Sequence, residues 1–207
     1  MTTNGANGLA DLLKEATAEA HRSAENHAFQ RSLVRGRVSR AALVRHQTGL
    51  LELVRAIETG LAALGSSGEG FRKAMRAHAA RLEADLGGLR NGEPGPPSPG
   101  VRAFRDALGG DSWPPQAALA AFYVIEGSMN GNRFIRRALL AARPDLAAHL
   151  AYFDPYGGDQ RRCWQETRTE ISRIGKQIGS PEVAVRAARA TFEVAGALAS
   201  EAVGSSA

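Results

Sequence analysis

Apolar residues recur at helical spacing along almost the whole chain, and no stretch alternates apolar and polar residues over the length of a strand. A repeat of three to four residues places apolar side chains on one face of a helix, whereas a half-buried strand needs strict alternation. The sequence therefore predicts an all-α fold. The chain has 207 residues, of which 43% are apolar, and this is enough for one sizeable core.

Helix-breaking and capping residues divide this pattern into segments. Ser39 is a predicted N-cap, and Pro144 is expected to stop a long helix. The join Gly179-Ser180-Pro181 combines a helix-ending glycine with a predicted N-cap serine and N1 proline. The predicted helices cover residues 9–28, 40–64, 70–86, 101–108, 116–142, 144–152, 159–178 and 181–203.

The segment 87–100 is rich in glycine and proline, and we expect it to be a surface connection inside one domain. A single domain is predicted over residues 9–203, with flexible ends at 1–8 and 204–207. The expected architecture is a bundle-like array of about seven helices.

Composition and charge exclude several classes of protein. No run of apolar residues is long enough to cross a bilayer, and the N-terminus lacks the profile of an export signal, so we expect a cytoplasmic protein without a membrane partner. Cys163 is the single cysteine, which excludes an internal disulfide and a zinc-finger site. The net charge of +5 comes mostly from arginine and permits an anionic ligand or an acidic partner. The charges are spread without interleaved aromatic residues, so no nucleic-acid partner is expected.

The predicted first helix carries Lys14, His21 and Glu25 together on one flank of its apolar stripe. A neutral His21 imidazole can ligate a metal, while Glu25, one turn later, can accept the other ring N–H and fix the tautomer. Lys14 lies two turns earlier, at a reach suited to an anionic edge of a bound cofactor. The alternative is a surface histidine with an i,i+4 partner, and spacing alone leaves both possibilities open.

A second unusual segment is VIEGSMNGNRFI, residues 124–135. Gly127 and Gly131 lie about one turn apart, and each costs about 1 kcal/mol relative to alanine inside a helix. They indicate either close helix packing or a flat ligand against exposed backbone. Three polar residues lie between and beside them, namely Ser128, Asn130 and Asn132. Such residues are poor choices for a tight apolar seam but suit a site that holds water or a bound gas, so a planar cofactor explains both features.

These two regions resemble heme oxygenases. LKEATAEAHRSAENHAFQRSLVRGRVSR, residues 13–40, resembles the proximal-helix region of that family. FYVIEGSMNGNRFIRRAL, residues 122–139, resembles the kinked distal helix, especially in the bacterial branch associated with bacteriophytochromes. The similarity in helix order extends over most of the chain, as far as AARATFEVAGALASEA, but only the first two segments carry specific motifs.

The resemblance implies a heme oxygenase fold with heme between the proximal first helix and the kinked distal helix. His21 matches the axial ligand of the heme iron, and Glu25 matches the carboxylate that accepts a hydrogen bond from its far nitrogen. Lys14 matches a basic residue that meets a heme propionate. Gly127 and Gly131 match the glycines that let the distal helix press against the porphyrin, where backbone groups contact dioxygen.

Three further residues are candidate contacts of the cofactor. Tyr123 precedes the distal glycines and, like its neighbour Phe122, is a candidate for a propionate. Arg168, on a late helix with Arg161 and Arg162, is a candidate for the second propionate. Phe192 is expected to be either an aromatic wall of the heme pocket or a core residue.

The activity implied by the resemblance is the oxidative cleavage of heme to biliverdin, carbon monoxide and ferrous iron, with dioxygen and external electrons. Heme is then both cofactor and substrate, and a ferredoxin, a flavodoxin or a reductase is the expected electron donor. Two alternatives stay open: a heme-binding carrier or sensor that does not degrade heme, and a helical protein of the same fold with an unrelated function.

The sequence departs from the family pattern at three positions. Ser128 stands where many heme oxygenases place an aspartate that organises a proton-supplying water. Asn132 replaces the second glycine of a pair, and Arg133 replaces a glutamine. We expect the fold and heme binding to tolerate these changes, and water held by Ser128, Asn130 or Asn132 to take over the role of the aspartate.

The remaining histidines have no carboxylate or second histidine at metal-site spacing, so surface or helix-packing roles are expected for His27, His46, His78 and His149. Trp113 and Trp164 are predicted packing anchors. A di-iron bundle is excluded, because it needs paired Glu-x-x-His motifs that the sequence lacks.

Overall fold

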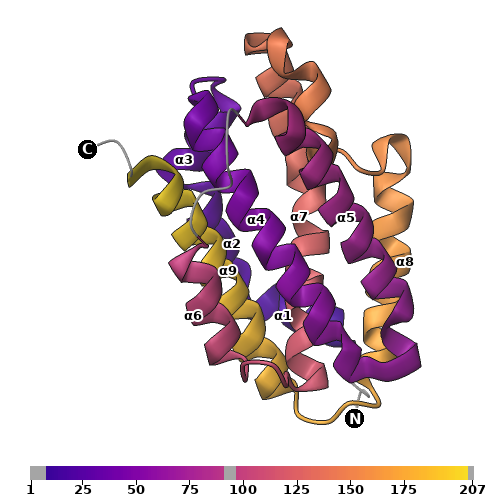
Figure 1. Ribbon diagram of the computed structural model, residues 1–207. Helices are drawn as coiled ribbons and strands as arrows, with labels where there is room; N and C mark the ends of the chain where they lie inside the picture. Colours follow the sequence, from indigo (N-terminus) through magenta and orange to yellow (C-terminus); the bar gives the residue numbers. More distant parts are fainter. Residues whose placement is uncertain (1–7, 91–96, 205–207) are drawn as a thin grey trace.

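The computed structural model describes residues 8–90 and 97–204, and all regular elements within these ranges are helical (Figure 1). The α-helices are α1 (Leu9–Ala16), α2 (Ala18–Glu25), α3 (Ala28–Val34), α4 (Arg40–Gly60), α5 (Glu69–Leu89), α6 (Pro99–Ala107), α7 (Pro115–Ala142), α8 (Gln160–Gly175) and α9 (Pro181–Gly204). Short 3-10 segments are η1 (Leu61–Gly68), η2 (Pro144–His149), η3 (Ala151–Phe153) and η4 (Gly157–Asp159). The all-α prediction is confirmed.

The long helices lie side by side, with α7 in the middle of the array (Figure 1). α4 packs against α5 and α9, and α7 packs against α8 and α9. All residues of α7 from 117 to 126 are buried, which is the pattern of a helix surrounded by other helices. None of the helices in the described residues is long and apolar enough to span a bilayer.

The predicted helix over residues 9–28 is wrong as a single helix, because the chain forms α1, α2 and α3 there. Thr17 separates α1 from α2 with φ −109° and ψ 6°, and its hydroxyl donates to the carbonyl of Leu13 at 2.7 Å. Such a bond from threonine to the preceding turn tends to bend a helix. His27 begins α3 as its N-cap, since its Nδ1 accepts a hydrogen bond from the N–H of Phe29 at 3.2 Å.

The next predicted boundaries are close to the observed ones. Ser39 caps α4 as expected, with its Oγ accepting from the N–H of Ala42 at 3.1 Å. α4 ends at Gly60, earlier than predicted, because a 3-10 segment follows in which Gly65 has φ 56°. α5 continues to Leu89, into the predicted connection 87–100.

The predicted ends of the chain and part of its main loop fall outside the described residues. This applies to 91–96 within the connection and to the ends 1–8 and 204–207, apart from Gly8 and Gly204.

Residues 144–152 were expected to form an α-helix, but they form the 3-10 segments η2 and η3 instead. The reason is a tertiary contact. The buried carboxylate of Asp85 on α5 accepts hydrogen bonds from the N–H groups of Ala151 and Tyr152, each at 2.9 Å. α7 ends before Pro144 as predicted, and Gly179 precedes α9 with φ 68°.

Candidate functional site

His21 and Glu25 lie on α2 one turn apart, as the sequence predicts. The Nδ1 atom of His21 is 3.6 Å from Oε1 of Glu25, and the two side chains are 57% and 67% exposed. Phe192 of α9 meets the imidazole edge-on, with ring centroids 5.9 Å apart. Among the described residues, Nε2 of His21 has no hydrogen-bond partner. The ring is therefore braced at Nδ1 and on one side, while Nε2 is available as a ligand.

Lys14 is exposed on α1, on the other side of the break at Thr17. The predicted two-turn relationship with His21 on one straight helix therefore does not hold. Lys14 still precedes α2 at its N-terminal end, where a flexible ammonium group has a wide reach.

The two glycines of α7 have different surroundings. A Cβ atom at Gly127 would lie 3.2 Å from Cη2 of Trp164 on α8, so the first glycine allows close packing between helices. At Gly131 a Cβ atom would have no neighbour within 4 Å, and the residue is exposed. α7 passes both positions without a break. Gly127 therefore serves close helix packing, whereas Gly131 leaves the backbone open.

The polar residues beside the glycines also differ in their hydrogen-bond partners. The hydroxyl of Ser128 donates to the carbonyl of Ile125 at 2.7 Å, which leaves its oxygen free to accept from a water. The amide nitrogen of Asn132 lies 3.6 Å from Sδ of Met129.

Asn130, in contrast, is directed toward α8. Its Nδ2 donates to the carbonyl of Gly127 at 2.9 Å, and its Oδ1 accepts from Nε2 of the buried Gln160 at 3.4 Å. Both ends of this amide are engaged, so Ser128 and Asn132 are better placed than Asn130 to hold a water.

Tyr123 and Arg168 lie close together beside the first glycine. The Tyr123 ring is 5.4 Å from that of Trp164, and Arg168 forms an ion pair with Asp11 that joins α8 to α1. Burial raises the pKa of Tyr123, with a smaller opposing effect from Arg168. This corner therefore offers a neutral phenol and a guanidinium group, which suit an anionic group at the end of a ligand.

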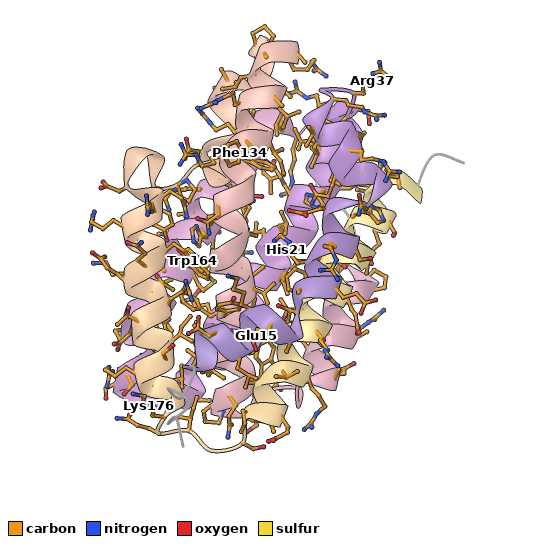
Figure 2. All side chains as sticks on the ribbon, turned by 180° about the vertical axis from the view of Figure 1, so that it is seen from behind. Glu15, His21, Arg37, Phe134, Trp164 and Lys176 are labelled. Carbon is orange, nitrogen blue, oxygen red and sulfur yellow. The ribbon has the colours of Figure 1, made fainter. Side chains whose placement is uncertain are left out.

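His21, Phe134 and Trp164 lie on one side of the molecule (Figure 2). Phe134 was missed by the sequence analysis. Its side chain is 61% exposed, and the guanidinium of Arg133 lies 5.6 Å from its ring centroid. The available signal was its position seven residues after Gly127 and three after Gly131, which places all three on one face of α7.

A buried polar cluster was also missed. Nε2 of His78 lies 2.9 Å from Oε2 of Glu126, and the two side chains are 0% and 3% exposed. The hydroxyl of Tyr156 donates to Oε1 of the same carboxylate. His78 was expected to have a surface or helix-packing role, and it is buried in the helix packing; its partner is 48 residues away and outside any local motif.

The other histidines have packing or capping roles. Burial lowers the pKa of His46 to about 4, with a smaller effect from His27. His27 caps α3, and His149 lies against Gly88. In the part of the chain that the structure describes, no group of three or more histidine, cysteine or acidic residues could hold a metal ion. A single axial histidine, the role expected of His21, requires no such group.

A shallow cavity lies between α2 and α9, on a different face of α2 from His21. It is lined by Ala20, Ser23, Ala24, His27, Phe192, Glu193 and Gly196. Phe192 lines this cavity and also contacts His21. Its side chain is only partly buried against the core.

A protein-family model for heme oxygenase matches residues 7–201 of the chain. The chain belongs to the heme oxygenase family. No curated protein sequence matches it. The predicted family is confirmed, while the branch associated with bacteriophytochromes and the roles of the proximal and distal segments stay predictions.

Solved structures with this fold include members of the family. Heme oxygenase from Leptospira interrogans has 20% identity and a TM-score of 0.75, with 94% of this chain and 100% of that chain covered. Heme oxygenase-1 from the cyanobacterium Synechocystis sp. PCC6803, solved in complex with heme, has 18% identity and a TM-score of 0.77, with 96% and 93% covered. A domain of unknown function with a heme oxygenase-like fold from Shewanella denitrificans OS217 has 12% identity and a TM-score of 0.67, with 97% and 92% covered. The fold is therefore that of the family, although the fold alone does not define the activity.

Proposed function

We propose that this member of the family is a heme oxygenase that cleaves heme oxidatively to biliverdin, carbon monoxide and ferrous iron, using dioxygen and external electrons. The observation that carries the proposal is His21, whose Nδ1 side is held by Glu25 and whose Nε2 has no hydrogen-bond partner among the described residues. The family match over residues 7–201 supports the activity. Relatives of the same fold from Synechocystis were solved with heme, and one of them with heme and NO.

The residues on this side of the molecule fit a heme. His21 offers an imidazole nitrogen, and Phe192 braces its ring. Gly131 leaves open backbone on α7, and Phe134 adds an exposed aromatic face three residues later. Bound heme would supply the iron centre at which dioxygen is reduced.

The edges of the site carry the groups that a heme carboxylate needs. Lys14 is exposed on α1, and Arg168 of α8, which pairs with Asp11 of the same α1 helix, lies near Tyr123. We propose that these three residues bind the propionates. Arg168 would exchange part of its interaction with Asp11 for a propionate, at small cost because both partners are partly exposed.

The protein residues have defined tasks in the reaction. Glu25, whose Oε1 lies 3.6 Å from Nδ1 of His21, would accept from this nitrogen after a small approach, which would fix the tautomer and raise the basicity of Nε2. Ser128 is the proposed holder of a distal water, because its oxygen keeps acceptor capacity after donating to Ile125. Trp164, seated on Gly127, closes the site toward α8. The backbone at Gly127 and Gly131, with Asn132, completes the distal wall, and Asn130 contributes through its contact with Gln160.

The alternative is a heme-binding carrier or sensor that does not consume heme. Ser128 separates the two functions, since a serine is not itself a strong proton source. If its water delivers protons, heme is consumed under reductant and oxygen; in a carrier it persists. The family match favours the enzyme.

The deciding experiment is an absorbance time course. The protein is mixed with one equivalent of hemin and then with a reductant in air, with catalase present to remove free peroxide. We expect a Soret band of a histidine-ligated complex that decays as a far-red bilin band appears. A stable Soret band would support the carrier or sensor, and no change on adding hemin would contradict both functions.

The matched variants are His21→Ala and His27→Ala, two histidines six residues apart. His21 is exposed, so we expect His21→Ala to remain folded and to lose the histidine-ligated Soret spectrum. His27→Ala should keep that spectrum and lose about 1 kcal/mol of stability, because it removes the N-cap of α3. A normal spectrum and normal turnover in His21→Ala would overturn the ligand assignment.

The electron donor is proposed to be an acidic ferredoxin or flavodoxin, or a reductase, acting in the cytoplasm. The support is the net charge of +5, carried mostly by arginine. Electrostatic attraction between such partners weakens with salt. The rate of reduction by an acidic ferredoxin should therefore fall as ionic strength rises, and a salt-independent rate would count against this choice.

A further inference from the structure

A polar cluster of three residues lies behind the glycine segment of α7, and the proposed heme chemistry does not use it. His78 comes from α5, Glu126 from α7, and Tyr156 from the segment between η3 and η4. The Glu126 carboxylate receives the hydroxyl of Tyr156 on Oε1 and faces Nε2 of His78 on Oε2 at 2.9 Å. One side chain of α7 is thus tied to two other parts of the fold.

The hydrogen bonds of the cluster have a definite direction. Burial, followed by the nearby Glu126 carboxylate, raises the pKa of Tyr156, so the phenol keeps its proton and donates it. Nδ1 of His78 is buried without a partner, which leaves Glu126 as the only hydrogen-bond partner of this ring within the described chain. The rings of Tyr152 and Tyr156 meet the imidazole edge-on, with centroid distances of 5.8 Å and 5.9 Å.

The position of Glu126 links this cluster to the glycine segment of α7. Glu126 directly precedes Gly127, in a stretch where two glycines weaken the helix. Successive positions on a helix lie about 100° apart around its axis, so the Glu126 side chain points away from the face of Gly127 and acts on the glycines through the backbone. A second tie follows one turn later, where Gln160 donates to Asn130 at 3.4 Å. The segment of α7 that the two glycines weaken is therefore held by the polar contacts of Glu126 and Asn130 with neighbouring parts of the fold.

We propose that Glu126, held by His78 and Tyr156, is a positioning residue that fixes the backbone of α7 at Gly127–Gly131 for the ligand. The nature of that ligand rests on the proposed function. The contacts of Glu126 with His78 and Tyr156, here called the tether, are present in the chain without ligand. They are therefore tested separately.

The first test uses hydrogen–deuterium exchange of the protein without heme, followed by mass spectrometry of peptides. Glu126→Ala removes the tether, Tyr156→Phe removes one hydroxyl, and Glu126→Gln keeps both contacts, because an amide can accept from Tyr156 and donate to the other tautomer of His78. Asp85→Ala is the matched control. It also removes a buried carboxylate with two hydrogen bonds, but one that holds Ala151 and Tyr152.

We expect Glu126→Ala to speed exchange in peptides covering the α7 glycines by about tenfold, with a smaller increase in Tyr156→Phe and near wild-type exchange in Glu126→Gln. Asp85→Ala should speed exchange around η3 and leave the α7 glycines unchanged. Unchanged exchange at the glycines in Glu126→Ala and Tyr156→Phe would overturn the inference. The same would follow if Asp85→Ala raised it equally. If Glu126→Ala does not fold, Tyr156→Phe decides.

The second test uses the protein loaded with hemin, reduced, and exposed to carbon monoxide as a vibrational probe. A distal backbone held in one position gives one narrow C–O stretching band, whereas a loosened backbone gives several environments. We expect a broadened or split band in Tyr156→Phe and Glu126→Ala, and a narrow band in Glu126→Gln and Asp85→Ala. A narrow wild-type band retained in all four variants would overturn positioning of the ligand. If the wild type takes up no hemin, the proposed function fails, while the exchange experiment still decides the tether.

Discussion

The indole ring of Trp164 lies on the backbone of Gly127, where a Cβ atom would be 3.2 Å from Cη2. The same ring packs against Tyr123 at a centroid distance of 5.4 Å. α7 and α8 are therefore in close contact at the first glycine, while Gly131, one turn later, has open space beside it. The two glycines should respond in opposite ways to the same substitution.

Gly131→Ala is expected to stabilise the protein without heme by up to about 1 kcal/mol, because alanine is the better helix former and meets no neighbour. The same methyl group enters the space proposed for the porphyrin, so hemin affinity should fall about tenfold. Urea unfolding and hemin titration measure the two effects. In Gly127→Ala the gain in helix propensity is offset by crowding of Trp164, so its stability should lie below that of Gly131→Ala. Unchanged hemin affinity in Gly131→Ala would contradict the proposed ligand face.

Arg168→Gln tests the proposed contact between Arg168 and a heme propionate. We expect hemin affinity to fall about fivefold and the free energy of unfolding to change by less than about 0.5 kcal/mol, since the ion pair with Asp11 is partly exposed. Arg173→Gln is the control, because Arg173 is on the same helix and pairs with Glu170 at the surface. Equal losses of affinity in both variants would indicate a general effect of charge.

Ser128→Ala should leave the Soret spectrum and hemin affinity unchanged and slow the loss of heme under reductant by about tenfold, because the proposed water loses its acceptor. Ser128→Asp introduces the carboxylate that many heme oxygenases carry and should restore or exceed the wild-type rate. Single-turnover absorbance traces provide the measurement. A Ser128→Ala rate equal to that of the wild type would remove this residue from the proton path.

His46 predicts a pH dependence of stability. Burial lowers its pKa in the folded protein from 6.5 to about 4, so between these values the unfolded chain binds more protons than the folded one. The free energy of unfolding is then fully retained above pH 6.5 and falls as the pH drops through this window, by about 2 kcal/mol between pH 7 and pH 5. Urea titrations at the two pH values measure the difference.

His46→Leu should reduce this difference, since leucine does not titrate and Nδ1 of His46 has no hydrogen-bond partner to lose. The same difference in wild type and variant would assign the pH dependence to other groups.

Local sequence patterns were sufficient for several elements of the fold and for part of the site. The spacing of His21 and Glu25 placed both side chains on one face of a helix, and the structure keeps them 3.6 Å apart. Ser39 as an N-cap and Pro144 as a stop were also predictable, because capping and proline geometry depend on residues within one turn.

The same local rules failed where a distant contact competes with them. The helix expected over 144–152 is replaced by 3-10 segments because Asp85, far away in the sequence, binds two of their N–H groups. The break at Thr17 has a local cause, the bond of its hydroxyl to Leu13, but threonine also occurs inside helices, as Thr191 does in α9 with the same type of bond.

The sequence by itself determined that the chain is helical, which segments form its long helices, and that one histidine has a carboxylate one turn away. These features follow from interactions between residues that are close along the chain. Only the tertiary structure decided that Trp164 covers Gly127, that Gly131 stays open, and that Glu126 joins His78 and Tyr156 behind the glycines. Such contacts depend on how helices pack against one another, and packing is set by the shape of the whole core rather than by any local repeat.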